Sequence, residues 1–296
     1  MHKFKVSVGD RIFDIANILI LTIITLIVLY PLYFVLIASF SDPVLVNSGK
    51  VLFAPRGINM EGYEILFHES KIWIGYINSL GYTTGGTLLN IAVTVPCAYA
   101  LSRKDMKWKR GILLFFIFTM YFHGGLIPDY LLIKQLNLMD TFWSIILPGS
   151  VNVYYLLIAR TFFAATIPNE LLESAKIDGA SNTRFLISVV IPLSKALIAV
   201  LVLFYALIHW NAWFNASIYL TSQNKWPLQL VLRSILVSVN YTNESFADAE
   251  SIEYATRLKE LVKYGVIIIA SVPVLLLYPF IQRYFIKGVM IGSIKG

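Results

Sequence analysis

The chain has 296 residues, of which 57% are hydrophobic and only 14% are charged, with a formal net charge of +7. A soluble domain carries roughly 25% charged residues, so this chain has too little charge to cover the surface of a soluble enzyme of its length. Its single cysteine, Cys97, excludes an intrachain disulfide and a cysteine metal cluster.

Six long windows contain no Asp, Glu, Lys or Arg: 15–41, 72–102, 111–128, 141–159, 196–224 and 264–282. Each is near or above the ~20 residues that a helix needs to cross the hydrocarbon core of a bilayer. A central charge costs about 2.5–3.5 kcal/mol on insertion, so such windows are typical of transmembrane helices rather than of buried helices in a soluble core. The sequence therefore predicts an all-α integral membrane protein, with one transmembrane domain over 1–296 and six transmembrane helices. We expect the first window to remain as an anchor, because it is too long for the apolar region of a cleaved signal peptide.

Orientation follows from the charges between the windows, because cytoplasmic loops carry an excess of Lys and Arg. One alternating set of segments has a net charge of +9, and the other set has −2. The first set is 1–14, 103–110, 160–195 and 283–296, and the second is 42–71, 129–140 and 225–263. The sequence thus predicts that both termini and the 160–195 loop are cytoplasmic. The basic balance is then a topology signal, and we expect no nucleic-acid partner.

Glycine and proline interrupt several windows, where they would kink a helix or let a neighbour pack closely. Ordinary packing is the alternative interpretation at any one of these positions. The interruptions are Gly85-Gly86, Pro96, Gly124-Gly125, Pro148-Gly149, Pro273 and Pro279.

The chain lacks the residues that would energise transport by itself. Its windows contain only His123 and His209 as ionisable groups besides tyrosine and cysteine, and neither has an acidic partner on its helix. Ion-coupled carriers usually place such pairs in the membrane, so this class is disfavoured. No phosphate-binding loop, zinc motif or nucleophile elbow is present either. We therefore predict no catalytic residue and no metal ligand in this chain, and a partner must supply the energy for uphill transport.

The loop at 167–192 carries the most information. Leu171 and Leu172 align with Ala175 at i+4 and i+3, which gives a small apolar face on a predicted helix of about three turns. Gly179 is suited to the left-handed conformation that ends a helix, and Ser181 can cap a second helix. The narrow apolar ridge fits a groove in a partner protein, and a helix lying on the lipid surface is the alternative.

Part of this loop resembles a known signature. Glu173-Ser174-Ala175, then three residues, Gly179, nine residues and Val189-Val190-Ile191-Pro192 is similar to the pattern E-A-A-x3-G-x9-I-x-L-P of permease subunits of binding-protein-dependent ABC importers. Ser174, Val189 and Ile191 depart from the pattern without changing its spacing. Further segments resemble the maltose-type branch for carbohydrate uptake: Asn78-Ser79-Leu80, 98–103, Trp210-Asn211 and the tail 282–296.

This resemblance implies the type I ABC importer permease fold in the cytoplasmic membrane of a bacterium, surrounded by membrane lipid. It implies a second permease subunit, two ATP-binding subunits that hold ATP and Mg, an extracellular solute-binding protein and an oligosaccharide substrate, with no cofactor on this chain. The residues implied to couple to the ATPase are Glu173, Ser174, Ala175, Asp178, Gly179 and Pro192. The implied ATPase-contacting tail residues are Lys287, Gly288, Gly292, Lys295 and Gly296.

The fifth window suggests a substrate path, because Tyr205, His209 and Trp213 recur at helical spacing. Aromatic faces with neighbouring amides suit sugars, which stack and accept hydrogen bonds. Helix packing or anchoring at the membrane interface is the alternative interpretation. The candidates for the path are Tyr205, His209, Trp210, Asn211, Trp213, Asn215, Asn90, Asn152 and Tyr155.

Other functions stay open at this level. The external segments 42–71 and 225–263 are long enough to meet a delivery protein, but the role of the second is undefined. Within the family the alternative is a permease for a non-sugar solute, such as a glycerol phosphate or a peptide. Outside the family it is an ion-coupled carrier.

Overall fold

The computed structural model describes residues 7–241 and 260–276. These residues are helical with connecting loops and contain no strand, which agrees with the predicted all-α class. The chain divides into two compact units, residues 1–69 with 235–271, and residues 70–234 with 272–296. The tail residues predicted to touch an ATPase, and Pro279, lie outside the described residues.

The first unit begins with α1 (Val8–Ser39), whose apolar side chains are exposed along nearly the whole helix. Ser7 and Asp10 form a capping box at its start, which satisfies amide groups that the first turn leaves without partners. Two short helices follow, α2 (Pro43–Asn47) and α3 (Glu61–His68). This unit has a small buried cluster that includes the C-terminal end of α1: Ile37, Ala38, Val46 and Val51.

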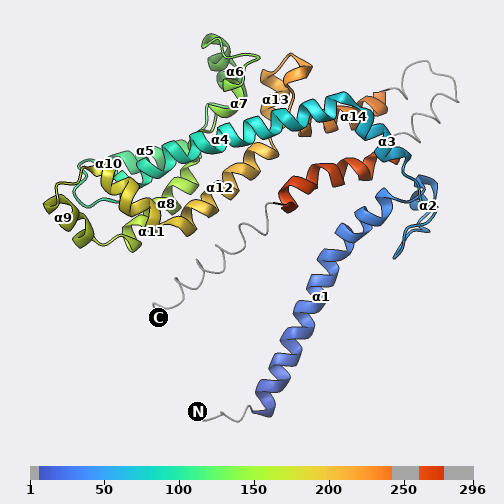
Figure 1. The fold of residues 1–296 in the computed structure, drawn as a ribbon, viewed down its shortest axis with the longest axis horizontal. Helices are drawn as coiled ribbons and strands as arrows, with labels where there is room; N and C mark the ends of the chain where they lie inside the picture. Colours follow the sequence, from blue (N-terminus) through green and yellow to red (C-terminus); the bar gives the residue numbers. More distant parts are fainter. Residues whose placement is uncertain (1–6, 242–259, 277–296) are drawn as a thin grey trace. The chain divides into compact units, whose positions relative to one another are not determined.

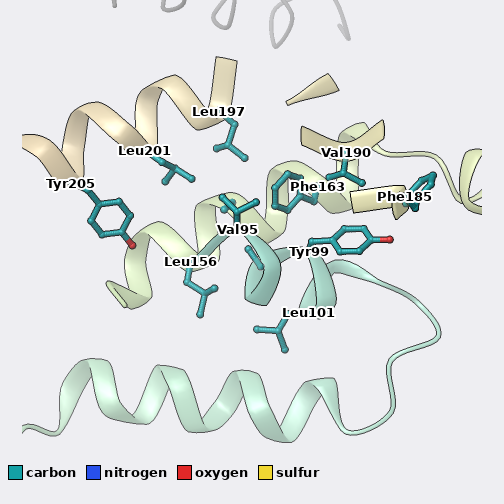
Figure 2. Close-up of a cluster of buried hydrophobic side chains, with 12 residues drawn as sticks. Val95, Tyr99, Leu101, Leu156, Phe163, Phe185, Val190, Leu197, Leu201 and Tyr205 are labelled. Atoms are coloured by element: carbon teal, nitrogen blue, oxygen red, sulfur yellow. The ribbon is translucent and has the colours of Figure 1, made fainter. Parts of the chain in front are cut away.

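The second unit is built around α4 (Ser70–Ser102), which packs along α8 (Val153–Thr166) and α12 (Lys195–Trp210). In addition, α5 (Lys109–Tyr121) packs against α8, and the elements of this unit can be followed in Figure 1. Their shared core consists of apolar side chains from α4, α8 and α12 and from the 182–193 segment (Figure 2). Its labelled members are Val95, Tyr99, Leu101, Leu156, Phe163, Phe185, Val190, Leu197, Leu201 and Tyr205.

Two charge-free windows are single long helices, α1 and α4, and α4 continues through Gly85-Gly86 and Pro96. Among the described residues these are the two helices long and apolar enough to cross a membrane alone, and at most four spans result if two bent helix pairs each count as one. The predicted six-span topology is therefore not confirmed, and it stays a prediction together with the cytoplasmic placement of the termini.

The predicted bounds of the other windows need correction. The helix of window 111–128 ends at Tyr121 and resumes as α6 (Leu126–Gln135) after a bend of 111°. Thirteen residues rise only about 20 Å, which is less than the ~30 Å of hydrocarbon. Gly125, at φ +90°, is the N-cap of α6 and adopts a conformation that other residues avoid.

Two further windows are broken in the same manner. Window 141–159 contains α7 (Trp143–Ile146), a break at Pro148-Gly149 and then α8. Window 196–224 contains α12, which ends at Trp210, and then α13 (Phe214–Tyr219). The breaks at Gly124-Gly125 and Pro148-Gly149 coincide with predicted interruptions. The last window is helical over 264–276, and its remainder lies outside the described residues.

A group of hydrogen bonds to the Asp140 carboxylate joins the segment after α6 to the segment after α13. One carboxylate oxygen accepts the backbone N–H groups of Thr221 and Ser222 at 3.1 and 3.0 Å. The other accepts the Ser222 hydroxyl at 2.7 Å and the Lys225 ammonium at 2.7 Å. These bonds, with that to Lys225 the main cause, hold the pKa of Asp140 well below its usual range.

The start of α4 is bound to the same region. The Asn78 side chain donates to the carbonyls of Asn224 and Trp226 at 2.8 and 3.0 Å, and the Tyr82 hydroxyl donates to the carbonyl of Lys225 at 2.9 Å. Asn78 belongs to one of the segments that resemble the maltose-type branch. In the structure it has a structural role, because it anchors the short 3-10 helix η2 (Gln223–Lys225).

We expect Asp140→Asn to lower the free energy of unfolding by about 2 kcal/mol, since it weakens several bonds to a charged group. Because folding lowers the pKa of Asp140, its stabilising contribution is complete above the ordinary carboxyl pKa of about 3.9 and is lost as the pH falls below that value. Thermal unfolding in detergent at pH 7 and at about pH 3 measures this. The difference between wild type and variant should shrink at acid pH, and the exposed control Asp14→Asn should behave as wild type. An Asp140 variant as stable as wild type at pH 7 would contradict the assignment.

Candidate functional site

The predicted helix of the 160–195 loop is α9 (Asn169–Ile177). Its end has the geometry of a Schellman motif: the Ala180 N–H donates to the Ala175 carbonyl, and the Gly179 N–H donates to the Lys176 carbonyl. Gly179 has φ +75°. The prediction that Gly179 ends this helix in the left-handed conformation is confirmed.

A second helix follows directly, as expected. The Ser181 hydroxyl accepts the Arg184 N–H at 3.2 Å and caps α10 (Asn182–Phe185). The helix widens into a π turn, η1 (Leu186–Val190), and then reaches α11 (Ile191–Leu193), which contains Pro192. Proline lacks an N–H donor and crowds the carbonyl four residues earlier, which favours a wider turn just before it.

The faces of α9 differ from the expected ridge. Leu172 and Ala175 pack against the core of their own unit, so they attach the helix to the body of the protein. Leu171 is exposed, and Ile177 is 87% exposed at the end of the helix. The other predicted coupling residues are exposed: Glu173, Ser174, Asp178, Gly179 and, on α11, Pro192. Ala175 is only partly buried, so it offers a partner less surface than the exposed residues do.

An ion pair holds α9, and a hydrogen bond holds α10, to the loop after α4. Asp105 binds the Arg103 guanidinium, and it lies 3.5 Å from the Lys176 ammonium on α9. Arg103 also donates to the Asn182 side chain at 2.6 Å. The Arg103 hydrogen bond, with a smaller contribution from Lys176, lowers the pKa of Asp105 to about 2, so this carboxylate is charged at neutral pH.

The second unit also contains a cavity of about 580 Å³ between α4, the α6–α7 region, the 147–152 loop and α12–α13. Apolar side chains form much of its wall, as is usual for small-molecule sites. Asp129 is its one formally charged lining residue among those described. The other polar side chains on its wall are Asn90, Asn152, Tyr205, His209, Asn215 and Tyr219.

Asn90 organises one side of this cavity. Its amide nitrogen donates to the carbonyls of Gly149 and Ser150 at 3.1 and 2.7 Å. Its side-chain oxygen lies 2.6 Å from Nε2 of His209. Since the oxygen only accepts, Nε2 of His209 carries the proton in this contact. Both side chains are buried, at 1% and 5% exposure, so the groups that would otherwise be unsatisfied bind one another.

Tyr205 forms hydrogen bonds in another part of the same wall. Its hydroxyl lies 2.8 Å from the Thr94 hydroxyl and accepts the Asn152 N–H at 3.3 Å. Asn152 in turn caps α8, because its side-chain oxygen accepts the Tyr155 N–H at 3.2 Å. Tyr155 lies behind this wall and stacks on Phe204, with ring centroids 5.4 Å apart.

Three other candidates for the path lie outside the cavity lining. Trp210 is buried against Tyr76, with ring centroids 5.9 Å apart. Asn211 ends α12 and donates to the Leu207 carbonyl at 2.9 Å. Trp213 carries the Arg233 guanidinium 3.7 Å above its ring. The expected stripe through Trp213 is wrong, because α12 ends at Trp210 and the helical spacing does not continue.

Two polar side chains on the cavity wall, those of Asn215 and Asp129, are available to a ligand. In the described structure neither the Asn215 amide nor the Asp129 carboxylate has a hydrogen bond or ion pair from its side chain. Sequence reasoning missed Asp129, because it lies just beyond a charge-free window and reads as a loop residue. Its position near the Gly124-Gly125 break was the available signal.

Comparisons with known proteins define the family. The chain is 36% identical over 296 residues to protein LplC of Bacillus subtilis (strain 168), covering 100% of this chain and 98% of LplC. It is 36% identical over 287 residues to the polygalacturonan/rhamnogalacturonan transport system permease protein YtcP of the same strain, covering 97% and 99%. This chain belongs to the carbohydrate ABC transporter permeases of the maltose type. No protein-family model matches it.

A solved structure supports the same family at the level of fold. The chain matches the structure of a bacterial ABC transporter involved in the import of the acidic polysaccharide alginate, with a TM-score of 0.82 and 30% identity. The match covers 96% of this chain and 100% of that chain. The ABC importer permease architecture expected from the resemblance is thereby supported.

In this permease, we expect Gly86→Ala to be destabilising by about 1–3 kcal/mol, because an added methyl group would overlap the His209 ring and separate it from Asn90. Gly81→Ala on the same helix is the matched control, since its added methyl group meets only Phe142 at an ordinary 3.8 Å. Thermal unfolding in detergent and carbohydrate uptake by cells compare the two. Equal midpoints for both variants would contradict the close packing of α4 on His209.

Proposed function

We propose that this permease forms, with a second permease, the transmembrane path of an ATP-driven importer for oligosaccharides. In this proposal an extracellular solute-binding protein delivers the substrate, and two ATPase subunits hold ATP and Mg. The complex would lie in the cytoplasmic membrane of a bacterium. The single observation that carries the proposal is that α9 presents exposed residues on one side and is fixed to the protein core on the other.

The coupling step follows from this attachment. A partner with two states can bias the permease only through contacts that differ between those states. Glu173, Asp178 and Ile177 are available for such contacts. Leu172, Ala175 and the Lys176–Asp105 ion pair would make the body move with the helix.

A displacement of α9 has a continuous route to the cavity. The segment Asn182–Leu193 follows α9 and meets α12 at a bend of 86°. Tyr205 and His209 of α12 line the cavity wall. Rotation at the bend would thus change the wall that these residues form. The tail residues Lys287–Gly296 would add a second contact to the ATPase pair.

The chemistry of the cavity suits the hydroxyl groups of a sugar. Asn215 supplies an amide donor and acceptor, and Asp129 supplies an acceptor. Because no described lining residue is cationic, this wall does not offer a charge partner to a uronate carboxylate. Relatives named for polygalacturonan and alginate import show that such substrates occur among similar transporters. For an acidic sugar, the second permease would have to supply the cation.

The coupling role predicts that Gly179→Val leaves membrane insertion intact but reduces uptake to near zero. A β-branched residue at φ +75° costs roughly 1–2 kcal/mol in the left-handed conformation, so the end of α9 would reshape. Gly179→Asn is the matched control, because asparagine tolerates this conformation, and it should retain most uptake. Uptake assays with quantification of the chain in membrane fractions test the pair. Normal uptake by the valine variant would refute this role for Gly179.

The path role predicts that Asn215→Ala raises the substrate concentration for half-maximal uptake by roughly 2–10-fold, which corresponds to one lost hydrogen bond. Its unfolding midpoint should not change, because the amide has no partner in the described structure. Asn211→Ala removes an amide outside the cavity and should leave half-saturation as in wild type. If the two variants gave the same half-saturation value, Asn215 would not contact substrate.

A further inference from the structure

A second cavity of about 490 Å³ lies at the opposite end of α8 from Asn152, next to α9. Its walls come from the end of α4, the 103–108 loop, the start of α5, the end of α8, the start of α9 and Phe185 of α10. The formally charged lining residues are Arg103, Lys104, Lys109, Arg160 and Glu170. Four cations thus face one carboxylate, whereas the first cavity has a single acidic residue.

The cations differ in how far the protein neutralises them. Arg103 is paired with Asp105, which does not line this cavity. Lys109 donates to the backbone carbonyl of Arg103 at 3.1 Å, which places its ammonium but leaves its charge uncompensated. Arg160 makes one long contact of 3.5 Å from Nε to the Leu101 carbonyl.

Glu170 does not neutralise the remaining charge. In the described structure no Lys or Arg nitrogen lies within 4.0 Å of its carboxylate. Lys104 likewise has no ion pair among the described residues. Lys104, Lys109 and Arg160 therefore leave an excess of about two positive charges over Glu170 in a partly enclosed space.

We propose that this cavity binds a phosphate group, and that the group is the headgroup of an anionic phospholipid. Guanidinium and ammonium groups suit phosphate oxygens, which accept several hydrogen bonds at once. Basic pockets between transmembrane helices on the cytoplasmic side bind anionic headgroups in this manner. The cavity lies next to α9, in the loop that the charge pattern predicts to be on the cytoplasmic side of the membrane.

The walls and surroundings of the cavity favour a lipid over a free phosphate ion. The volume is far larger than a bare ion needs, and apolar side chains such as Phe163, Ile167 and Leu172 share the lining with the cations. On α5, which begins at Lys109, the apolar side chains of Leu114 and Phe115 are exposed. Acyl chains would cover this apolar surface while the headgroup occupies the cationic space.

The test uses the permease purified in mild detergent with the subunits that accompany it. Native mass spectrometry measures retained phospholipid, and thermal unfolding measures the response to added short-chain phosphatidylglycerol, with phosphatidylcholine as the zwitterionic reference. Each Lys or Arg near an anionic lipid contributes about fivefold in affinity. Lys109→Gln/Arg160→Gln should therefore require roughly 25-fold more phosphatidylglycerol for the same rise in midpoint, and it should retain less lipid.

Two matched variants separate the site from general charge and from misfolding. Lys107→Gln/Arg110→Gln removes the same charge from neighbouring residues that do not line the cavity, and it should bind as wild type. Lys109→Arg/Arg160→Lys keeps both charges and should also retain lipid. If the two glutamine variants lost lipid equally, the effect would be general surface charge and the proposal would be overturned.

Further arms distinguish the source of the phosphate group. Stabilisation of the wild type by millimolar inorganic phosphate, absent in Lys109→Gln/Arg160→Gln and without retained lipid, would keep the phosphate site but assign it to the free ion. Equal responses of wild type and this variant to both lipid and phosphate would overturn the proposal. So would loss of the accompanying subunits from the variant with unchanged lipid, because the cavity would then hold acidic groups of a protein partner.

Discussion

The buried side-chain amide of Asn90 joins its own helix, α4, to the 147–152 loop and to α12. No pattern in the sequence connects these three segments. The amide binds two carbonyls of the 147–152 loop and the ring of His209, while Gly86, one turn earlier on α4, leaves room for that ring. A break inside an apolar window exposes carbonyl groups that need partners away from water. The Asn90 amide nitrogen is the hydrogen-bond donor for these carbonyls, so the loop can stay irregular and line a cavity.

The same logic explains how the second unit holds its other broken segments. Asp140 and Lys225 bind the loop before α7 to the loop after α13, and Asn78 and Tyr82 bind the second of these loops to α4. At the α9 end, Asp105 connects the loop after α4 to α9 through Lys176. Polar contacts thus fix the loops, whereas the apolar core of α4, α8 and α12 fixes the helices.

The two cavities have opposite electrostatic character, which separates their proposed roles. The first contains one carboxylate and neutral polar groups, a surface on which hydroxyl-rich solutes can form and release hydrogen bonds. The second concentrates uncompensated cations next to α9, a surface that holds an anion. The second cavity is lined by α8 and α9, so a ligand in it would lie against the segment through which coupling is proposed to pass.

Much of this architecture was predictable from local sequence. The apolar windows identified α1 and α4, and the Gly179 and Ser181 positions identified the end of α9 and the start of α10. Gly124-Gly125 and Pro148-Gly149 marked the true breaks. These features are local because each depends on helical hydrogen bonding or on one residue's backbone conformation, so the residues themselves determine them.

The tertiary structure alone decided which polar residues serve the fold and which remain free. Asn90 and Asn215 are the same residue type in similar apolar windows, yet within the described part of the chain the first makes three side-chain hydrogen bonds and the second makes none. Ala175 turned inward and Ile177 outward on one short helix. Whether a polar side chain finds a hydrogen-bond partner depends on distant segments meeting in space, as Asn90 meets His209, 119 positions away in the sequence. Periodicity within one segment carries no information about such contacts.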